Sequence, residues 1–464
     1  MRCRKPQERC WHVWRRLSPC HKLRTWVSLT KPCCGGAPLF ELPDRMVQLQ
    51  AQIRAGQIST QQALLAQVAQ GRALRGQYAC VVDELPMTAP EAGPLVGIAL
   101  AHKDIFDLQG RLPGCGVQHG APQMGLQPAA AITALANAGA SQWATLVMSP
   151  HACGATAQNP HFARCVNPLD EAAAVGGSSS GSAIAVAAGI TYAALGTDTA
   201  GSVRIPAATC GLIGLKTTQG AVSTQGCAPL APSLDSVGVL SRCPQDAREI
   251  WQALSPQSLR ETRVTDAVCQ VWLPGRGVDS QVIQAMRDWI TQLDAKVSEV
   301  DMTAEFEQLN RHAQRVLFYE TARTHRASLL AGQAEPAVQA IGMPGLGVPD
   351  AWYQESIAAR GAFLEQFVQR HFNDAEFLIL PALGCLLPDG SAVEVGNPAF
   401  DRTQLAGMHA FMGFVNYLGL PALNLPIARD ARHRPICVQV LARPFAEHRL
   451  LDFAEQAELI SRVT

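Results

Sequence analysis

Two loops of small residues, separated by one short apolar segment, constrain this sequence more than any other feature. The first loop is GGSSSGS (176–182), which runs into a small-residue segment, and the second is GTDTAGSVRIP (196–206). The segment between them, ending in ITYAAL (190–195), predicts a short strand. A strand followed by a tight turn of small residues can direct several backbone N–H groups to one point, where they stabilise an oxyanion. Ser202, at the end of that turn, is then placed as a nucleophile.

A nucleophilic serine needs a base. The G-x-S-x-G pattern is absent around Ser202, so the sequence does not indicate an α/β-hydrolase triad. Lys103 follows the apolar run LVGIALA (95–101), where burial would favour the neutral amine. Lowering the pKa of a lysine from its usual value to near 7 requires about 4–5 kcal/mol. Asp104 would oppose that shift only if its carboxylate stayed close, and adjacent side chains on a strand point to opposite faces.

These residues alone leave other interpretations open. A glycine-serine run is more often a flexible loop, and a lone lysine is usually solvated surface. Hydrophobic periodicity is more informative about the fold class. It predicts helices over 46–53, from Ser59, and over 129–139, 279–293, 305–331 and 403–418, and strands over 95–101, 190–195, 211–215, 376–380, 422–427 and 436–441. This alternation predicts an undivided α/β architecture over residues 46–464.

Charge and composition exclude several classes of protein. The chain has 38 basic and 38 acidic side chains, and charged residues make up only 16% of it. This balance argues against a disordered chain and against a nucleic-acid binder, which would carry a basic surplus. No apolar run reaches the ~18 residues that a membrane helix needs, so we expect no membrane association. Without a secretory signal, we expect a cytoplasmic protein with reduced cysteines.

Residues 1–40 differ in composition from the rest. They hold nine basic side chains against one acidic, five of the fifteen cysteines and three of the eight tryptophans. We interpret this segment as an appendage to one domain formed by residues 41–464. Two interpretations of it remain: a basic targeting segment, or disordered or spurious sequence upstream of a start at Met46. The second is favoured because cysteine and tryptophan are unusual in targeting segments.

The remaining ten cysteines are scattered, without C-x-x-C pairs, and the sequence contains no H-E-x-x-H. Zinc sites need clustered ligands at short spacings, so we expect no metal and no other cofactor. GLIGLKT (211–217) is similar to a phosphate-binding loop, but Leu215 separates glycine from lysine and a buried strand is the better interpretation.

An ordered set of motifs resembles the amidase signature family. The set is KDIFD (103–107), GGSSSGSA (176–183), GTDTAGSVRIPA (196–207), GLIGLK (211–216), SLDSVG (233–238), GLPALNLPI (419–427) and CVQVLARPF (437–445). The resemblance spans roughly residues 46–464 with the motifs in the family's order. It implies a central mixed β-sheet flanked by helices on both faces.

The resemblance also implies an activity and the residues that perform it. Ser202 is the expected nucleophile, Ser178 the bridging serine in a cis peptide, and Lys103 the base. The backbone N–H groups of Thr199, Ala200, Gly201 and Ser202 are expected to form the oxyanion hole. The implied reaction is metal-independent hydrolysis of a small-molecule amide through an acyl-enzyme. Specificity is expected in the variable segments 305–345 and 381–400, and a homodimer is left open.

Two alternatives remain beside this interpretation. One is the amidase component of a tRNA-dependent amidotransferase, which belongs to the family that this chain resembles but for which residues 46–464 offer no basic patch. The other is a catalytically silent, binding-only relative. Ala200 keeps this alternative open, while retention of all three catalytic side chains argues against it. Three departures from the family's pattern are present, none of which removes a catalytic group: Ser180 and Ala200 stand where the family usually has glycine, and residues 111–120 lack its threonine-rich turn. A positive φ at either position would cost ~1–2 kcal/mol.

Four further side chains allow a functional and a structural interpretation. We expect Arg204 to anchor the nucleophile loop and Asp198 to act as an acceptor within it. We expect His102 to be a satisfied buried histidine rather than a modulator of Lys103. Arg323 and Arg326 could clamp a carboxylate, but a solvated helix face is favoured.

Overall fold

The computed structural model describes residues 40–87, 89–117, 127–255 and 267–461. Clustering of contacts divides the chain into Met1–Glu41 and Leu42–Thr464, and only the second unit is described below. Its strands are β1 (Val81–Glu84), β2 (Ala99–Lys103), β3 (Ser141–Leu146), β4 (Ala193–Asp198), β5 (Ile213–Lys216), β6 (Ser236–Ser241), β7 (Ala267–Val271), β8 (Ala295–Glu299), β9 (Phe377–Pro381), β10 (Ala422–Arg429) and β11 (Pro435–Leu441).

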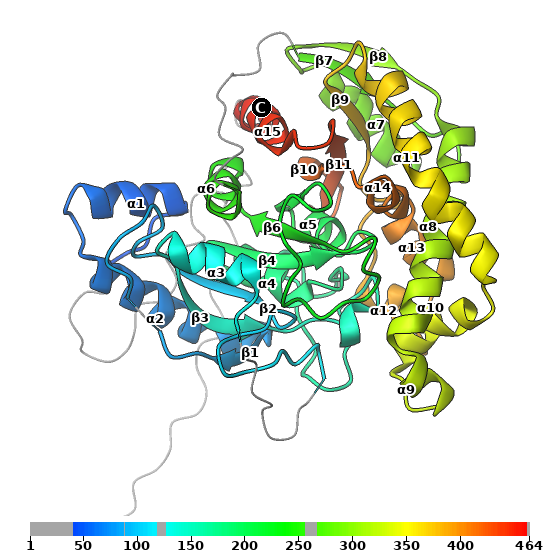
Figure 1. Cartoon of the computed structure of the whole chain (residues 1–464). Coiled ribbons are helices and arrows are strands. Elements are labelled where there is room, and N and C mark those ends of the chain that lie inside the picture. Colours follow the sequence, from blue (N-terminus) through cyan, green and yellow to red (C-terminus); the bar gives the residue numbers. More distant parts are fainter. Residues whose placement is uncertain (1–39, 88, 118–126, 256–266, 462–464) are drawn as a thin grey trace, which may run out of the picture. The chain divides into compact units, whose positions relative to one another are not determined.

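Helices alternate with these strands along the chain (Figure 1). The described helices are α1 (Met46–Arg54), α2 (Thr60–Tyr78), α3 (Ala130–Asn137), η2 (Pro150–Ala152), α4 (Ser180–Ala187), α5 (Arg204–Thr209), α6 (Pro244–Leu254), α7 (Ser280–Ile290), α8 (Thr303–Thr324), α9 (Arg326–Leu330), α10 (Pro336–Leu346), α11 (Asp350–Phe372), α12 (Gly390–Val393), α13 (Arg402–His409), α14 (Gly413–Leu418) and α15 (Glu447–Ser461).

The strands form two hydrogen-bonded sheets. The small sheet has the order β1-β3-β2, with β1 antiparallel and β2 parallel to β3. The large sheet has the order β4-β6-β5-β10-β11-β9-β7-β8, antiparallel except for the parallel pairs that β7 makes with β9 and β8. The fold is therefore mixed α/β, as expected, but the sheet is divided in two.

Side chains join the two sheets where β2 lies beside β4. The backbone N–H of Leu195 donates to Nδ1 of His102 (3.0 Å), and the Thr191 hydroxyl donates to the carbonyl of Ala99 (3.4 Å). The buried imidazole thus accepts a hydrogen bond from a backbone N–H of the edge strand of the large sheet. This is the satisfied histidine that the sequence suggested, and it lies one residue before Lys103.

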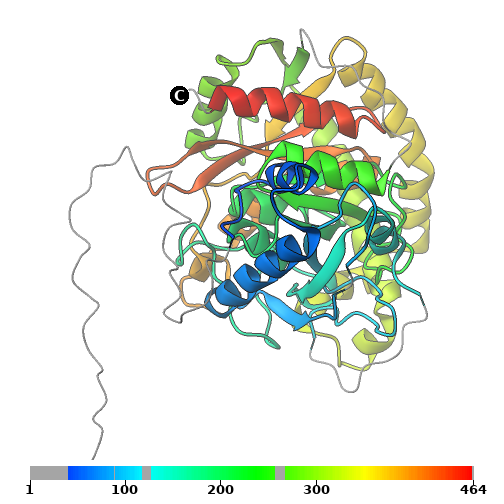
Figure 2. The ribbon, with the colours of Figure 1, turned by 90° about the vertical axis from the view of Figure 1, so that its left-hand side faces the viewer.

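Helices cover the large sheet on both sides. Helices α6 and α15 pack against each other and against the sheet on one side (Figure 2), while α8, α11 and α14 form a layer on the other (Figure 1). The core of that second layer is rich in aromatic side chains, including Phe367, Phe414 and Tyr417. Burying each such ring stabilises the fold by roughly 1.5–3 kcal/mol. Among the described helices, none is both long and apolar enough to span a membrane.

Candidate active site

Lys103 occupies the last position of β2 and is completely buried. Its Nζ donates to the hydroxyl of Ser178 (2.8 Å) and to the hydroxyl of Thr197 (2.9 Å) on β4. Burial lowers the pKa of Lys103 to about 7, against the opposing pull of the Asp235 and Asp198 carboxylates. A lysine in this state holds a large neutral fraction near neutral pH, so its amine can accept a proton.

The glycine-serine loop is packed rather than flexible, because residues 176–182 are all buried. The peptide bond between Gly177 and Ser178 is cis. The carbonyl of Ser178 accepts from the N–H of Ser149 (3.1 Å), and the N–H of Gly181 donates to the carbonyl of Val147 (2.8 Å). A Cβ added at Gly181 would lie 2.5 Å from that carbonyl oxygen, so the small residue permits this close approach. The loop is therefore fixed to the chain that follows β3.

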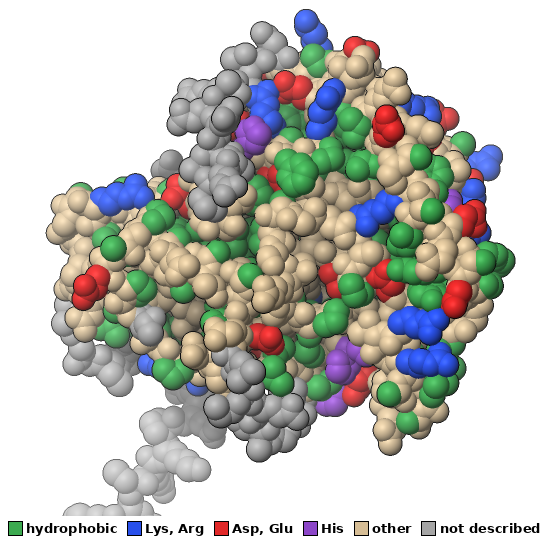
Figure 3. Space-filling model, in the orientation of Figure 1, with side chains coloured by type: hydrophobic (Ala, Val, Ile, Leu, Met, Phe, Trp, Pro, Cys, Tyr) green, Lys and Arg blue, Asp and Glu red, His purple; other side chains and the backbone are tan. Residues whose placement is uncertain are grey.

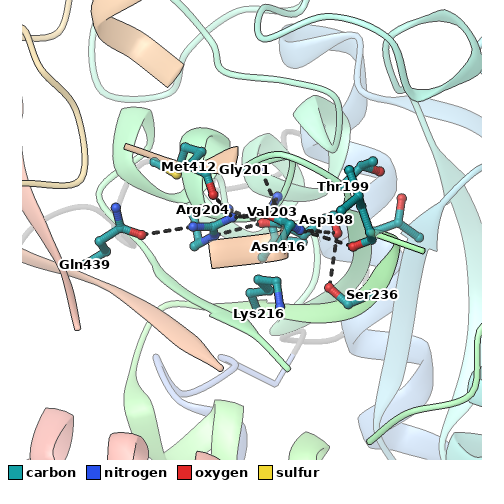
Figure 4. Close-up of polar contacts among 12 residues, drawn as sticks. Asp198, Thr199, Gly201, Val203, Arg204, Lys216, Ser236, Met412, Asn416 and Gln439 are labelled. Atoms are coloured by element: carbon teal, nitrogen blue, oxygen red, sulfur yellow. Dashed lines mark hydrogen bonds and ion pairs between the residues drawn. The ribbon is translucent and has the colours of Figure 1, made fainter. Parts of the chain in front are cut away.

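The second small-residue loop (196–206), which we call the nucleophile loop after the expected role of Ser202, folds around one carboxylate, as Figure 4 shows. Asp198 accepts hydrogen bonds from the N–H groups of Gly201 (2.8 Å) and Val203 (3.1 Å). Gly201 has φ +106°, and a Cβ there would strike Met412, so only glycine suits the turn. Ser202 follows directly, and its carbonyl accepts from the N–H of Ser179 (3.2 Å), which brings the two loops together.

Arg204 compensates the buried carboxylate. Its guanidinium binds both oxygens of Asp198, at 2.9 and 3.1 Å, and reaches Gln439 (2.9 Å) and Asn416 (2.6 Å) (Figure 4). Burial alone would raise the pKa of Asp198, but Arg204, Lys216 and Asn416 hold it well below its usual range. Breaking such a buried pair costs about 3–5 kcal/mol. The structure thus shows Arg204 as the anchor and Asp198 as the acceptor that the sequence suggested.

One of the four expected oxyanion donors is engaged elsewhere. The N–H of Gly201 points to Asp198 Oδ1, so it is unavailable for a substrate oxygen in this structure. The two departures from glycine are not strained, because neither Ser180 nor Ala200 has a positive φ. The Ser180 hydroxyl is instead buried without a hydrogen-bond partner.

A small cavity of about 90 Å³ adjoins this site. Thr197, which accepts from Lys103, and Thr199 line one side of it. Its lining residues are Ile105, Ala152, Thr197, Thr199, Thr224, Cys227, Ala228, Pro229, Leu230, Pro232 and Asp235. Asp235 is the one charged side chain among these described residues, and the walls are otherwise apolar or hydroxyl-bearing.

Sequence reasoning gave no role to Thr197, Asp235 or Asn416. Asp235 lies inside the SLDSVG segment, and Thr197 is the second residue of the GTDTAGSVRIP loop, so the motifs contained both residues without indicating their contacts. The Asn416 side chain donates to Asp198 Oδ1 (2.9 Å) and to the carbonyls of Asp198 (2.8 Å) and Leu234 (3.3 Å). It therefore ties the nucleophile loop to the chain before β6.

The other sequence candidates have structural contacts. Residues 213–216 form strand β5. Lys216, at the end of this strand, is buried, and its Nζ donates hydrogen bonds to the carbonyls of Thr217 (2.9 Å) and Leu420 (2.8 Å). Arg323 is exposed and pairs with Asp350 (2.9 Å), which agrees with a solvated helix face. Within the described residues, no group of three or more His, Cys, Asp or Glu side chains could hold a metal ion.

The comparisons with known proteins agree with the mixed α/β fold. The family model described as Amidase matches residues 65–451. A glutamyl-tRNA(Gln) amidotransferase subunit from Halorhodospira halophila is 28% identical, over 90% of this chain and 97% of that protein. A crystal structure of an amidase superposes with a TM-score of 0.80 at 27% identity, covering 89% of this chain and 99% of that one. A 6-aminohexanoate cyclic dimer hydrolase shares the fold, with a TM-score of 0.76 at 21% identity, covering 90% and 96%.

The structure thus places a buried lysine on a serine hydroxyl within a mixed α/β fold. The chain belongs to the amidase, or amidase signature, family. Family and structural neighbours support a hydrolase that acts on C–N bonds.

Proposed function

We propose that this chain hydrolyses the C–N bond of a small linear carboxamide through Ser202, Ser178 and Lys103, without a metal or other cofactor. The observation that carries the proposal is the buried hydrogen bond from Lys103 Nζ to Ser178 Oγ (2.8 Å). A neutral Lys103 can accept the proton of Ser178 while Ser178 takes that of Ser202. The family resemblance and the contact between the two loops, in which the Ser179 N–H donates to the Ser202 carbonyl (3.2 Å), support the same assignment.

The proposed reaction proceeds in two balanced halves. Ser202 Oγ attacks the amide carbon while its proton passes through Ser178 to Lys103. The N–H groups of Thr199, Ala200 and Ser202 stabilise the resulting oxyanion. Collapse breaks the C–N bond, and the same relay returns the proton to the departing amine. Water then attacks the acyl ester by the same route and releases the acid.

The cavity supports a small acyl group without a negative charge. Its volume of about 90 Å³ corresponds to the liquid volume of roughly three waters, at about 30 Å³ each. The described lining offers Asp235 but no arginine, lysine or histidine, so a substrate carboxylate placed there would lack a partner. Small neutral amides should therefore react faster than amides with a carboxylate on the acyl chain.

A fluorophosphonate probe tests the nucleophile without knowledge of the substrate. The wild type should be labelled at Ser202, and Ser202→Ala should remove both labelling and ammonia release from a panel of amides. Ser182→Ala is the matched control, because this buried serine of the first loop only donates to the Leu195 carbonyl (3.1 Å). Labelling that survives Ser202→Ala would refute the assignment. A folded wild type that takes no label would favour the binding-only relative.

The second candidate is the amidase component of a tRNA-dependent amidotransferase, which the similarity to the Halorhodospira halophila protein favours. The described part of the face in Figure 3 shows basic and acidic side chains interspersed among neutral and apolar ones. Purification from cells under mild conditions separates the candidates. Amide hydrolysis by the chain alone supports the amidase, whereas activity that requires a co-purifying second protein supports the amidotransferase.

A further inference from the structure

Asp235 lines the cavity and directly precedes strand β6 in the sequence. Its carboxylate accepts hydrogen bonds from three donors. Its Oδ1 accepts from the Thr199 hydroxyl (2.6 Å) and the Ala231 N–H (3.3 Å), and its Oδ2 accepts from the Leu230 N–H (3.0 Å). One carboxylate therefore joins the nucleophile loop to the cavity wall at Leu230 and Ala231.

The cavity wall is in turn fixed to helix α8. Glu320, a buried carboxylate of α8, accepts from the N–H of Ser233 (2.9 Å) and also binds the Ser233 hydroxyl. The Thr324 hydroxyl donates to the carbonyl of Leu230 (3.1 Å). Asp235 thus ends a continuous series of contacts from α8, in the segment where specificity is expected, to the nucleophile loop.

Asp235 also acts on Lys103 through space. Among the groups that favour the protonated form of Lys103, Asp235 contributes most, ahead of Asp198. Burial raises the pKa of Asp235 to about 6, so its carboxylate is mostly ionised at neutral pH. The other titratable groups around this pair are the thiols of Cys115, Cys153 and Cys227, and Asp104, which faces Arg111 at 3.7 Å. Burial raises the pKa of each of the three thiols, which are therefore neutral near pH 7.

The geometry points to Asp235 as a positioning residue of the amidase site: its carboxylate holds the Thr199 hydroxyl against the Leu230 and Ala231 N–H groups and so fixes the nucleophile loop to the cavity wall. This inference rests on the proposed function. It assigns to Asp235 two separable effects, one through a hydrogen bond and one through charge. A merely structural carboxylate would not move the midpoint of the pH profile.

The test measures the labelling rate of Ser202 by a fluorophosphonate from pH 5 to pH 9. Lys103 must be neutral to act, so the rate should rise through a midpoint near its pKa of about 7. Asp235→Asn removes the charge and should move the midpoint down by about one pH unit. Asp235→Glu keeps the charge, so its midpoint should stay near that of the wild type although the rate falls.

Two further variants separate charge from hydrogen bonding. Thr199→Val removes the hydrogen bond but keeps the carboxylate, so the rate should fall about tenfold with the midpoint unmoved. Asp246→Asn is the matched control, because Asp246 is also buried and accepts from two backbone N–H groups, of Met46 (2.9 Å) and Val47 (3.1 Å), but does not act on Lys103. Its midpoint should equal that of the wild type.

The outcomes are distinguishable. A folded Asp235→Asn variant with an unmoved midpoint overturns the inference and leaves the proposed function intact. A Thr199→Val variant that labels at the wild-type rate also overturns it, and this arm decides the question if Asp235→Asn does not fold. A folded wild type that takes no label overturns the proposed function and this inference together.

Discussion

Nδ1 of His102 accepts a hydrogen bond from the backbone N–H of Leu195 at 3.0 Å. A side chain of β2 is therefore hydrogen-bonded to β4, the edge strand of the large sheet. Only an unprotonated Nδ1 can accept this bond. Burial lowers the pKa of His102 to about 3, so the ring is neutral whenever the protein is folded near neutral pH. This contact between the two sheets is therefore sensitive to acid.

His102→Asn should weaken the dependence of stability on pH. The folded pKa of about 3 lies below the ordinary value of 6.5, so the unfolded chain binds the proton first and stability falls as pH drops from about 6.5 towards 3. Between pH 7 and pH 5 this loss amounts to about 2 kcal/mol. Asparagine keeps an acceptor and does not titrate, so the variant should lose about 2 kcal/mol less over that interval. Urea unfolding at both pH values measures this, and equal losses would contradict it.

Lys103→Arg and Lys103→Ala should both abolish turnover, because arginine stays charged at every working pH. In the wild type, kcat/KM should rise with pH through about 7 as Lys103 loses its proton. Lys216 is a useful comparison, since burial also lowers its pKa to about 7. Lys216→Met should leave the midpoint of the pH profile in place even if the rate falls. A midpoint that moves in Lys216→Met would assign the titration to the wrong lysine.

Ser178→Ala should separate proton transfer from nucleophilic attack. A positioned proton relay contributes about 10²–10⁴-fold, so turnover should slow by that factor while the nucleophile remains. Slow fluorophosphonate labelling should then persist, and peptide mapping should place the adduct on Ser202. An adduct on Ser178, Ser179 or Ser180 of the wild type would show that the nucleophile is misassigned.

Ser180→Ala should stabilise the fold. The hydroxyl of Ser180 is fully buried without a hydrogen-bond partner, and an unsatisfied buried polar group costs about 1–3 kcal/mol. Its removal should raise the free energy of unfolding by about 1 kcal/mol. Ser182→Ala provides the contrast, because that hydroxyl donates to Leu195 and its loss should lower stability by a similar amount. Chemical unfolding of both variants decides the point, and a destabilised Ser180→Ala would refute it.

Chains that begin at Leu42 and at Met46 should differ in stability. Residues 43–45 make several side-chain contacts with the rest of the domain. Tyr192 donates to the Pro43 carbonyl (2.8 Å) and Arg242 to that of Asp44 (2.9 Å). Arg45 pairs with Glu458 (2.9 Å) and donates to Gln245 (3.2 Å). The chain that begins at Met46 lacks them and should be less stable by about 1–3 kcal/mol. Equal melting temperatures would show that these contacts contribute nothing. Activity of the chain from Leu42 tests separately whether residues 1–40 are dispensable.

Local pattern predicts elements better than it predicts their breaks and partners. Periodicity predicts one helix over residues 305–331, but α8 ends at Thr324 and α9 begins at Arg326 because the chain turns at His325. Residues 403–418 likewise divide into α13 and α14. The helix start at Ser59 is confirmed, since its side chain accepts from the N–H of Gln62. Periodicity reports which face is apolar and carries no information on where a helix bends.

The candidate site shows the same division. The two loops and Lys103 stand out in the sequence because their chemistry is concentrated in a few adjacent positions. The contact of Asp235 with Thr199 spans 36 positions, and that of Lys103 with Thr197 spans 94. Such pairs depend on strand order and register, which residue pattern does not encode locally. The hydrogen bond from the Gly201 N–H to Asp198 depends on the direction in which the backbone N–H points. The residue pattern does not predict that direction either.

The proposed base and nucleophile belong to different hydrogen-bonded sheets, with Lys103 ending β2 of the small sheet and Ser202 following β4 of the large one. In the part of the chain that the structure describes, the two sheets share no ladder of backbone hydrogen bonds, and side-chain hydrogen bonds such as that of His102 connect them. Turnover therefore reports on the docking of two substructures rather than on either one. A perturbation that separates them by a fraction of an ångström would silence the enzyme while circular dichroism still showed every helix and strand in place.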